Sequence, residues 1–160
     1  MPDLNDYLLD VGDAQWAELM ADWSFVVPED FTVWFANRFG NVFMVYPDGS
    51  VHLLIIDDGT LLCLAEGREQ FALAIDRGNN ASEWLMMPLI DACVAAGLTL
   101  TPGRCYGFKQ LPVLGGTFET DNIEVIDVAV YFSLAAQINE QIRDMPPGTK
   151  VRFKIGPEPA

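Results

Sequence analysis

The sequence predicts an α+β fold in which a mainly antiparallel sheet is flanked by helices. Two turn signals, Pro47-Asp48-Gly49 and Asp57-Asp58-Gly59, separate three apolar runs. Asp-Gly between apolar runs is typical of a tight hairpin turn, because glycine adopts a positive φ without strain. Elsewhere, apolar residues recur at helical spacing, as they do in 16–23 and 134–142. We therefore expect a strand meander over about residues 31–65, further strands later in the chain, and helices around them.

The three apolar runs of the meander predict strands at 41–46, 51–56 and 60–64. The middle run is apolar on both faces except for His52, which favours a central strand covered on both sides. Residues 29–39 fit either a strand or a helical turn. We favour a strand there because β-branched and aromatic residues dominate, and the meander then has four strands.

Before the meander, residues 3–9 predict a short helix, and Asp13 is a suitable N-cap for a second one. The second helix would carry an apolar stripe formed by Trp16, Leu19, Met20 and Trp23. Residues 25–27 precede a proline, which favours an extended exit from that helix.

After the meander, the sequence predicts a helix opening at Gly67 and closing at Gly78, a short turn at 82–86, and a helix from Pro88 to Ala96. Residues 104–109 predict a strand whose Gly107 lies where something packs closely. Residues 123–132 have strand-like composition, and a helix begins at Ser133 or Leu134. Residues 151–155 predict a final edge strand.

Charge narrows the classes of partner. The net charge is −14, and residues 1–37 contain no Lys or Arg. Such a surface repels nucleic acid and anionic membranes and attracts basic partners, although acids also simply keep a protein in solution. No apolar run reaches membrane-spanning length and no signal peptide is visible, so a cytoplasmic protein is the expectation. The acids of residues 1–37 are Asp3, Asp6, Asp10, Asp13, Glu18, Asp22, Glu29 and Asp30.

Catalytic and metal-binding patterns are weak. Three cysteines at long spacings and one histidine do not predict a zinc site or any other metal site, and we expect Cys63, Cys93 and Cys105 to be buried free thiols. His52 has no nucleophile beside it in sequence and is expected to be a partly buried, hydrogen-bonded side chain. No cofactor motif is present, so we expect no catalytic residue and no cofactor.

Two groups of charged residues each allow a structural and a functional interpretation. Asp57 with Asp58, and the acids at 119–127, fit an acid pair or a cation site, but Asp-Gly favours a solvated turn. Arg104, Tyr106 and Lys109 fit either a strand with two solvated cations or a pocket for a partner.

Two motifs, RCYGFKQLPVLGG at 104–116 and YFSLAAQINEQIRDMPPGTKV at 131–151, resemble a bacterial family long labelled a domain of unknown function. The resemblance includes WFANRFGNVFMVYPDGSVHLL at 34–54 and WLMMPLIDACVAAGL at 84–98. The family is similar to the C-terminal domain of type VI secretion immunity proteins, within a GAD-like and SUKH-like group. We expect a single domain over 1–160, with an acidic helical region at 1–27 and a family-like core at 28–155.

The resemblance implies a non-catalytic immunity protein that binds and neutralises a cognate, basic, DNA-degrading toxin. Acids in turns are the expected contacts, since an acidic inhibitor can compete for the cations that a nuclease presents to phosphate. A general protein-interaction module and a metal- or acid-pair-dependent enzyme are the alternatives. The expected contact residues are Asp48, Asp57, Asp58, Glu119 and Asp121.

Overall fold

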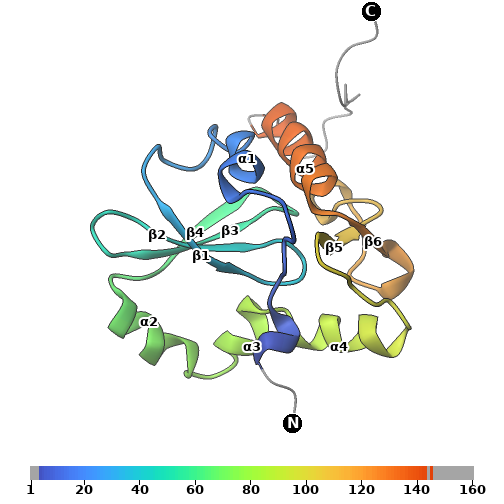
Figure 1. Ribbon diagram of the computed structural model, residues 1–160, viewed down its shortest axis with the longest axis horizontal. Helices are drawn as coiled ribbons and strands as arrows, with labels where there is room; N and C mark the ends of the chain where they lie inside the picture. The colour runs from blue at the N-terminus through green and yellow to red at the C-terminus, as the bar shows by residue number, and fades with distance from the viewer. Residues whose placement is uncertain (1–3, 144, 146–160) are drawn as a thin grey trace, which may run out of the picture.

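The computed structural model describes residues 4–143 and 145. A four-stranded antiparallel sheet runs in the order β1-β2-β3-β4, which confirms the predicted meander (Figure 1). Its two predicted turns contain Gly49 and Gly59, whose φ angles are +89° and +76°. The strands are β1 Thr32–Ala36, β2 Val42–Val45, β3 Val51–Ile55 and β4 Thr60–Ala65.

The uncertain segment at 29–39 contains the strand β1, as we favoured. β1 pairs with β2 alone and is an edge of the sheet, with a register shift between Val33 and Phe35. β3 lies inside the sheet and is mostly buried, with His52 half-buried, as predicted for a central strand.

Helices cover both faces of this sheet. In Figure 1, α1 and α5 lie on one side of it, and α2, α3 and α4 lie on the other. The helices are η1 Leu4–Tyr7, α1 Trp16–Ala21, α2 Arg68–Ile75, α3 Asn80–Trp84, α4 Met87–Ala95 and α5 Val128–Ile142. The fold is therefore α+β, as the sequence predicts.

Two predictions around α1 are wrong. The helix begins after Gln15, so Asp13 lies in the preceding loop and is not its cap. Residues 25–27 are not extended, because the amides of Val26 and Val27 both donate to the carbonyl of Trp23, at 3.0 Å each. The chain thus turns immediately after α1 and returns toward β1.

A second, two-stranded sheet joins β5 Arg104–Phe108 to β6 Ile123–Asp127. Between these strands lie the short 3-10 helices η2 Pro112–Leu114 and η3 Thr120–Asn122. Gly107 is buried in β5, and a Cβ added there would lie 2.8 Å from the side chains of Ile126 and Tyr131. The prediction of close packing at this glycine is confirmed.

The predicted strand at 123–132 is wrong beyond Asp127. The Asp127 carboxylate accepts a hydrogen bond from the Val130 amide at 3.1 Å and caps α5, which starts at Val128 and not at Ser133 or Leu134 as the sequence suggested. Val128, Tyr131 and Phe132 are strand formers, but burial of all three against the sheets outweighs that preference. The predicted strand at 151–155 lies outside the described residues.

The thiol predictions are confirmed for Cys93 and Cys105, which are buried and free. They are wrong for Cys63, which is exposed because it lies on the edge strand β4. Burial raises the pKa of the Cys93 thiol to about 11, so this thiol is not poised as a nucleophile.

Asn37 connects the turn between β1 and β2 to helix α3 through side-chain hydrogen bonds. This residue is fully buried, and its Nδ2 donates to the carbonyl of Trp84 in α3 at 3.0 Å. Its Oδ1 accepts from the amides of Phe39 and Asn41, at 3.0 and 3.1 Å. The two bonds to the amides are buried, and the bond to the Trp84 carbonyl is partly buried.

Replacement of Asn37 by alanine is expected to lower the free energy of unfolding by about 2 kcal/mol, because it leaves buried amides and a carbonyl without partners. Urea unfolding measures this loss. Asn79→Ala is the matched control, since Asn79 is exposed and its side chain makes no capping bond to α3. Equal losses in the two variants would contradict the account.

Candidate protein-binding site

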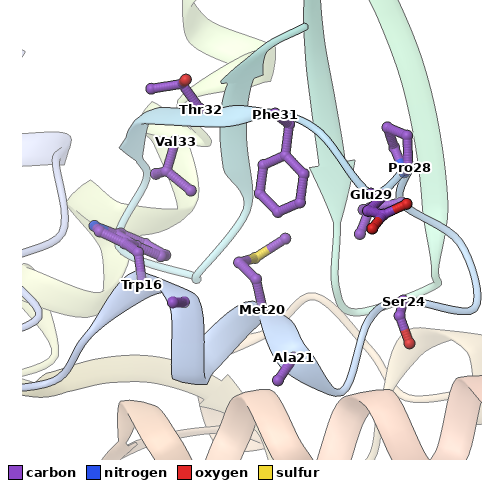
Figure 2. A pocket seen from close by; sticks show the side chains of 11 residues that line it. Trp16, Met20, Ala21, Ser24, Pro28, Glu29, Phe31, Thr32 and Val33 are labelled. Carbon is purple, nitrogen blue, oxygen red and sulfur yellow. The ribbon is translucent and has the colours of Figure 1, made fainter.

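An open apolar groove of about 710 Å³ lies between α1 and β1. It forms because the chain turns after α1 and returns to the sheet edge, which leaves the helix and the strand side by side. Figure 2 shows Met20 and Phe31 pointing into this space from opposite walls. The lining residues are Trp16, Ala17, Met20, Ala21, Ser24, Val27, Pro28, Glu29, Phe31, Thr32 and Val33.

The floor of the groove is well supported. Met20 and Val27 are buried, and Trp16 packs edge-on against Phe132 of α5 with ring centroids 5.9 Å apart. Phe31 and Val33 are half-buried, so part of each side chain remains open to a partner. The groove is thus a preformed apolar surface.

Acids surround the groove. Glu29 lines it, and Glu18, Asp22 and Asp30 are exposed next to lining residues in the sequence. Arg143 also lies nearby, but its guanidinium donates to the carbonyl of Phe25 at 2.6 Å and stacks over the ring of that residue. Arg68 lies beside β1 as well, with its guanidinium 5.4 Å from the centroid of the Trp34 ring. The named acids near the groove are therefore more numerous than the cations, but a cation lies beside the strand that forms one wall.

The outer edge of β1 is available over part of its length. The N-terminal segment covers one end, where the Leu9 amide donates to Ala36 at 2.9 Å and the Arg38 amide donates to Tyr7 at 3.1 Å. Within the described residues, no strand pairs with the outer edge at Thr32–Trp34. Edge strands present unpaired amide and carbonyl groups to other chains.

The predicted contact acids do not gather in one place. Asp48 and Asp58 are exposed, but they lie in the turns at opposite ends of β3. The Asp48 carboxylate accepts from the hydroxyl and amide of Ser50, and these bonds hold its pKa below the ordinary value. Glu119 and Asp121 are exposed at η3 in the second sheet region.

Asp57 corrects the prediction of a solvated turn. This residue is only 4% exposed, and its Oδ1 has no hydrogen-bond partner among the described residues. The turn lies beneath α5, where Asn139 Nδ2 donates to the carbonyl of Ile56 at 3.1 Å. Burial, followed by the nearby Asp58 charge, raises the pKa of Asp57 to about 7. Asp58 itself is solvent-exposed, as the turn prediction required.

The other candidates have structural roles. His52 is half-buried, lies 2.8 Å from the Ser50 hydroxyl and stacks on Tyr46, as the sequence suggested. Tyr106 is fully buried and donates to the carbonyl of Leu98 at 2.6 Å, so it does not form a surface pocket with Arg104 and Lys109.

The described residues contain no group of three or more histidine, cysteine, aspartate or glutamate side chains that could hold a metal ion. In the same part of the chain, no helix is long and apolar enough to cross a membrane.

Sequence reasoning missed the groove. It identified the stripe on α1 and favoured a strand over 29–39, but it did not place the two against each other. The signal available was the exclusively acidic charge of residues 1–37, which contain both walls.

Comparison with known proteins tests the family resemblance that the sequence predicts. Residues 65–139 match the family model T6SS immunity protein Tdi1, C-terminal. The chain is similar to type VI secretion immunity proteins. The match confirms the predicted resemblance, and it starts later and ends earlier than the expected core at 28–155. A comparison with curated proteins finds no match.

The structure of Atu4351 from Agrobacterium tumefaciens has a similar fold, with a TM-score of 0.54 and 17% sequence identity. The similarity covers 75% of this chain and 63% of that chain, so this chain spans less than two thirds of the other.

The Tdi1-like stretch begins at the end of β4 and ends within α5. It contains Glu119 and Asp121 but neither wall of the groove. It meets the groove indirectly, since Phe132 of α5 supports Trp16. The Tdi1-like part of the fold thus contacts the N-terminal helix α1 through the Phe132 ring.

Proposed function

We propose that this protein is a non-catalytic immunity protein that binds and neutralises a cognate secreted toxin with DNA-degrading activity. The match of residues 65–139 to the Tdi1 C-terminal family carries the proposal. The protein would act in the cytoplasm, where such a toxin reaches DNA.

The charge of the molecule supports a basic partner. An enzyme that degrades DNA presents Lys and Arg side chains to phosphates, and a protein of net charge −14 can compete for the same cations. Complementary charge also accelerates association, which favours rapid neutralisation of a toxic enzyme.

The exposed predicted acids are the proposed polar contacts. Asp48, Asp58, Glu119 and Asp121 all lie on the surface in turns or short helices. We leave Asp57 out of this set because its carboxylate is buried beneath α5. The four acids lie on separate parts of the surface, so a partner need not contact all of them.

Single replacement of each of these acids by lysine tests the assignment. At least one variant is expected to bind the toxin about tenfold more weakly and to associate more slowly at low salt, since reversal turns an attraction into a repulsion. Surface plasmon resonance with the product of the adjacent gene measures both rates. Asp76→Lys, an exposed acid outside the set, is the control. Unchanged affinity in all variants would remove these residues from the contact surface.

A general protein-interaction module is the second candidate, favoured by the open apolar groove. Immunity requires that one toxin be bound and neutralised, whereas an interaction module would bind without protecting cells.

A further inference from the structure

We propose that residues 150–155 of this same chain occupy the groove between α1 and β1, with their apolar side chains against its floor and their cations at its acidic rim. These residues lie outside the described part of the chain. The inference concerns the protein alone and does not rest on the proposed function. A groove filled in this way is closed to other proteins until a competitor displaces the segment.

The path of the chain places the segment near the groove. Directly after α5, the guanidinium of Arg143 donates to the carbonyl of Phe25 at 2.6 Å. Phe25 lies in the turn between α1 and β1, and Ser24 and Val27 of the same turn line the groove. Residues 143–150 span up to about 24 Å when extended. This reach exceeds the length of α1, which is about 9 Å, so the segment can lie along the groove.

The segment carries an apolar side chain at every second position, namely Val151, Phe153 and Ile155. The sequence predicts an extended conformation there, in which alternate side chains point to the same side. The groove offers them Met20 and Phe31, which point into it from opposite walls (Figure 2). Insertion of the three side chains would remove apolar surface of both the segment and the groove from water.

The acids of the groove lie on its own side of the sheet, on both walls. Asp22 directly follows α1 and is exposed, and Glu29 lines the groove just before β1. When the apolar side chains of the segment face the floor, its Lys and Arg side chains can bend back to this rim along their aliphatic stems. The segment contains no acid, and its three cations are Lys150, Arg152 and Lys154.

The cations already described near the groove do not oppose this arrangement. Arg68 lies over the Trp34 ring, and neither residue is among those that line the groove. Arg143 is bonded to the carbonyl of Phe25 and stacks over its ring, which holds its charge at the end of α5. The segment therefore meets acids at the rim, and no cation lines the groove.

Two competing arrangements are less favourable. A second pocket lies at the end of α5, but its volume is about 340 Å³ against about 710 Å³ for the groove, and Arg143 is one of the residues that line it. A cationic segment is repelled there. The segment of a second copy could also enter the groove, but a short tether keeps the chain's own segment at an effective concentration of about 1 mM.

Photocrosslinking in the full-length protein tests the location of the segment. The photoreactive amino acid p-benzoylphenylalanine replaces Phe153, and mass spectrometry identifies the residues that it captures. We expect crosslinks within one chain to residues 16–33, which contain both walls. The same amino acid in place of Phe118, an exposed phenylalanine outside the groove, is the control and should not capture those residues. Absence of crosslinks from position 153 to residues 16–33, or crosslinks there only between two chains, would overturn the proposal.

Charge reversal in the segment tests the role of the acidic rim. The triple variant Lys150→Glu, Arg152→Glu and Lys154→Glu is expected to reduce the crosslink from position 153 about fivefold, since attraction becomes repulsion. The matched control exchanges the cations without changing their charge, as Lys150→Arg, Arg152→Lys and Lys154→Arg, and should retain the yield. Equal yields in the two variants would show that the acids do not hold the segment, which would overturn the proposal.

A groove-filling variant tests the site itself. Ala21→Trp places a large side chain in the groove from the exposed end of α1, and it is expected to reduce the crosslink from position 153 about tenfold. Ala72→Trp is the matched control, because Ala72 is an exposed alanine of α2 outside the groove. If both variants give the wild-type yield, the segment does not lie in the groove and the proposal fails.

Discussion

Replacement of Asp57 by asparagine is expected to remove a large pH dependence from the stability of the protein. The Asp57 carboxyl has a pKa of about 7 in the folded chain, above its ordinary value of 3.8, because it is buried and lies near Asp58. The folded state therefore binds a proton more tightly than the unfolded state does. Stability is greatest below the unfolded pKa and is lost as the pH rises toward the folded pKa.

The difference between these pKa values corresponds to about 4 kcal/mol of stability, lost between about pH 4 and pH 8. In Asp57→Asn this loss should vanish, so the variant should be more stable than the wild type at pH 8. Urea unfolding at pH 5 and pH 8 should detect about 3 kcal/mol of this loss, because the rest has already occurred below pH 5. Asp58→Asn, an exposed neighbour, should retain most of the pH dependence. A wild-type decline that persists unchanged in Asp57→Asn would contradict the account.

Replacement of Gly107 by alanine is expected to lower the free energy of unfolding by about 3 kcal/mol. A Cβ at this position would lie 2.8 Å from Ile126 in β6 and from the Tyr131 ring in α5, both parts of a packed region. To relieve the short contact with the Tyr131 ring, the second sheet would have to move away from α5. Tyr131 cannot easily give way, because it is buried and its hydroxyl accepts from the Phe108 amide at 3.3 Å.

Gly67→Ala is the matched control for this variant. The φ of Gly67 is −163°, an ordinary extended value, and its added Cβ would meet only the end of the Gln70 side chain. That side chain can rotate away, so a loss below about 1 kcal/mol is expected. Thermal or urea unfolding compares the two variants, and a loss at Gly67 as large as that at Gly107 would show that the freedom of the neighbouring side chain to move does not set the cost.

The local parts of the fold could be predicted from sequence because their signals are local. Asp-Gly turns fix the meander, and Gly107 marked a close approach before its neighbours were known. The start of α5 could not be predicted, since Val128, Tyr131 and Phe132 favour a strand and only their burial against two sheets makes them helical.

The sites depend on contacts between distant residues, and there the sequence was less informative. Asp57 looks like an ordinary turn aspartate, and only the approach of Asn139, far along the chain, buries its turn. The groove likewise needs α1 and β1 side by side, supported by Phe132. The acidic charge of residues 1–37 indicated a basic partner, but it did not indicate where an apolar surface would lie among those acids.

Co-expression with the product of the adjacent gene tests the central claim most directly, with growth as one readout and purification of a complex as the other. The account predicts that the neighbour alone degrades DNA and stops growth, and that this protein restores growth and forms a stable complex with it. A toxic neighbour that still stops growth in the presence of this protein, with no complex recovered, would contradict the claim that the protein confers immunity.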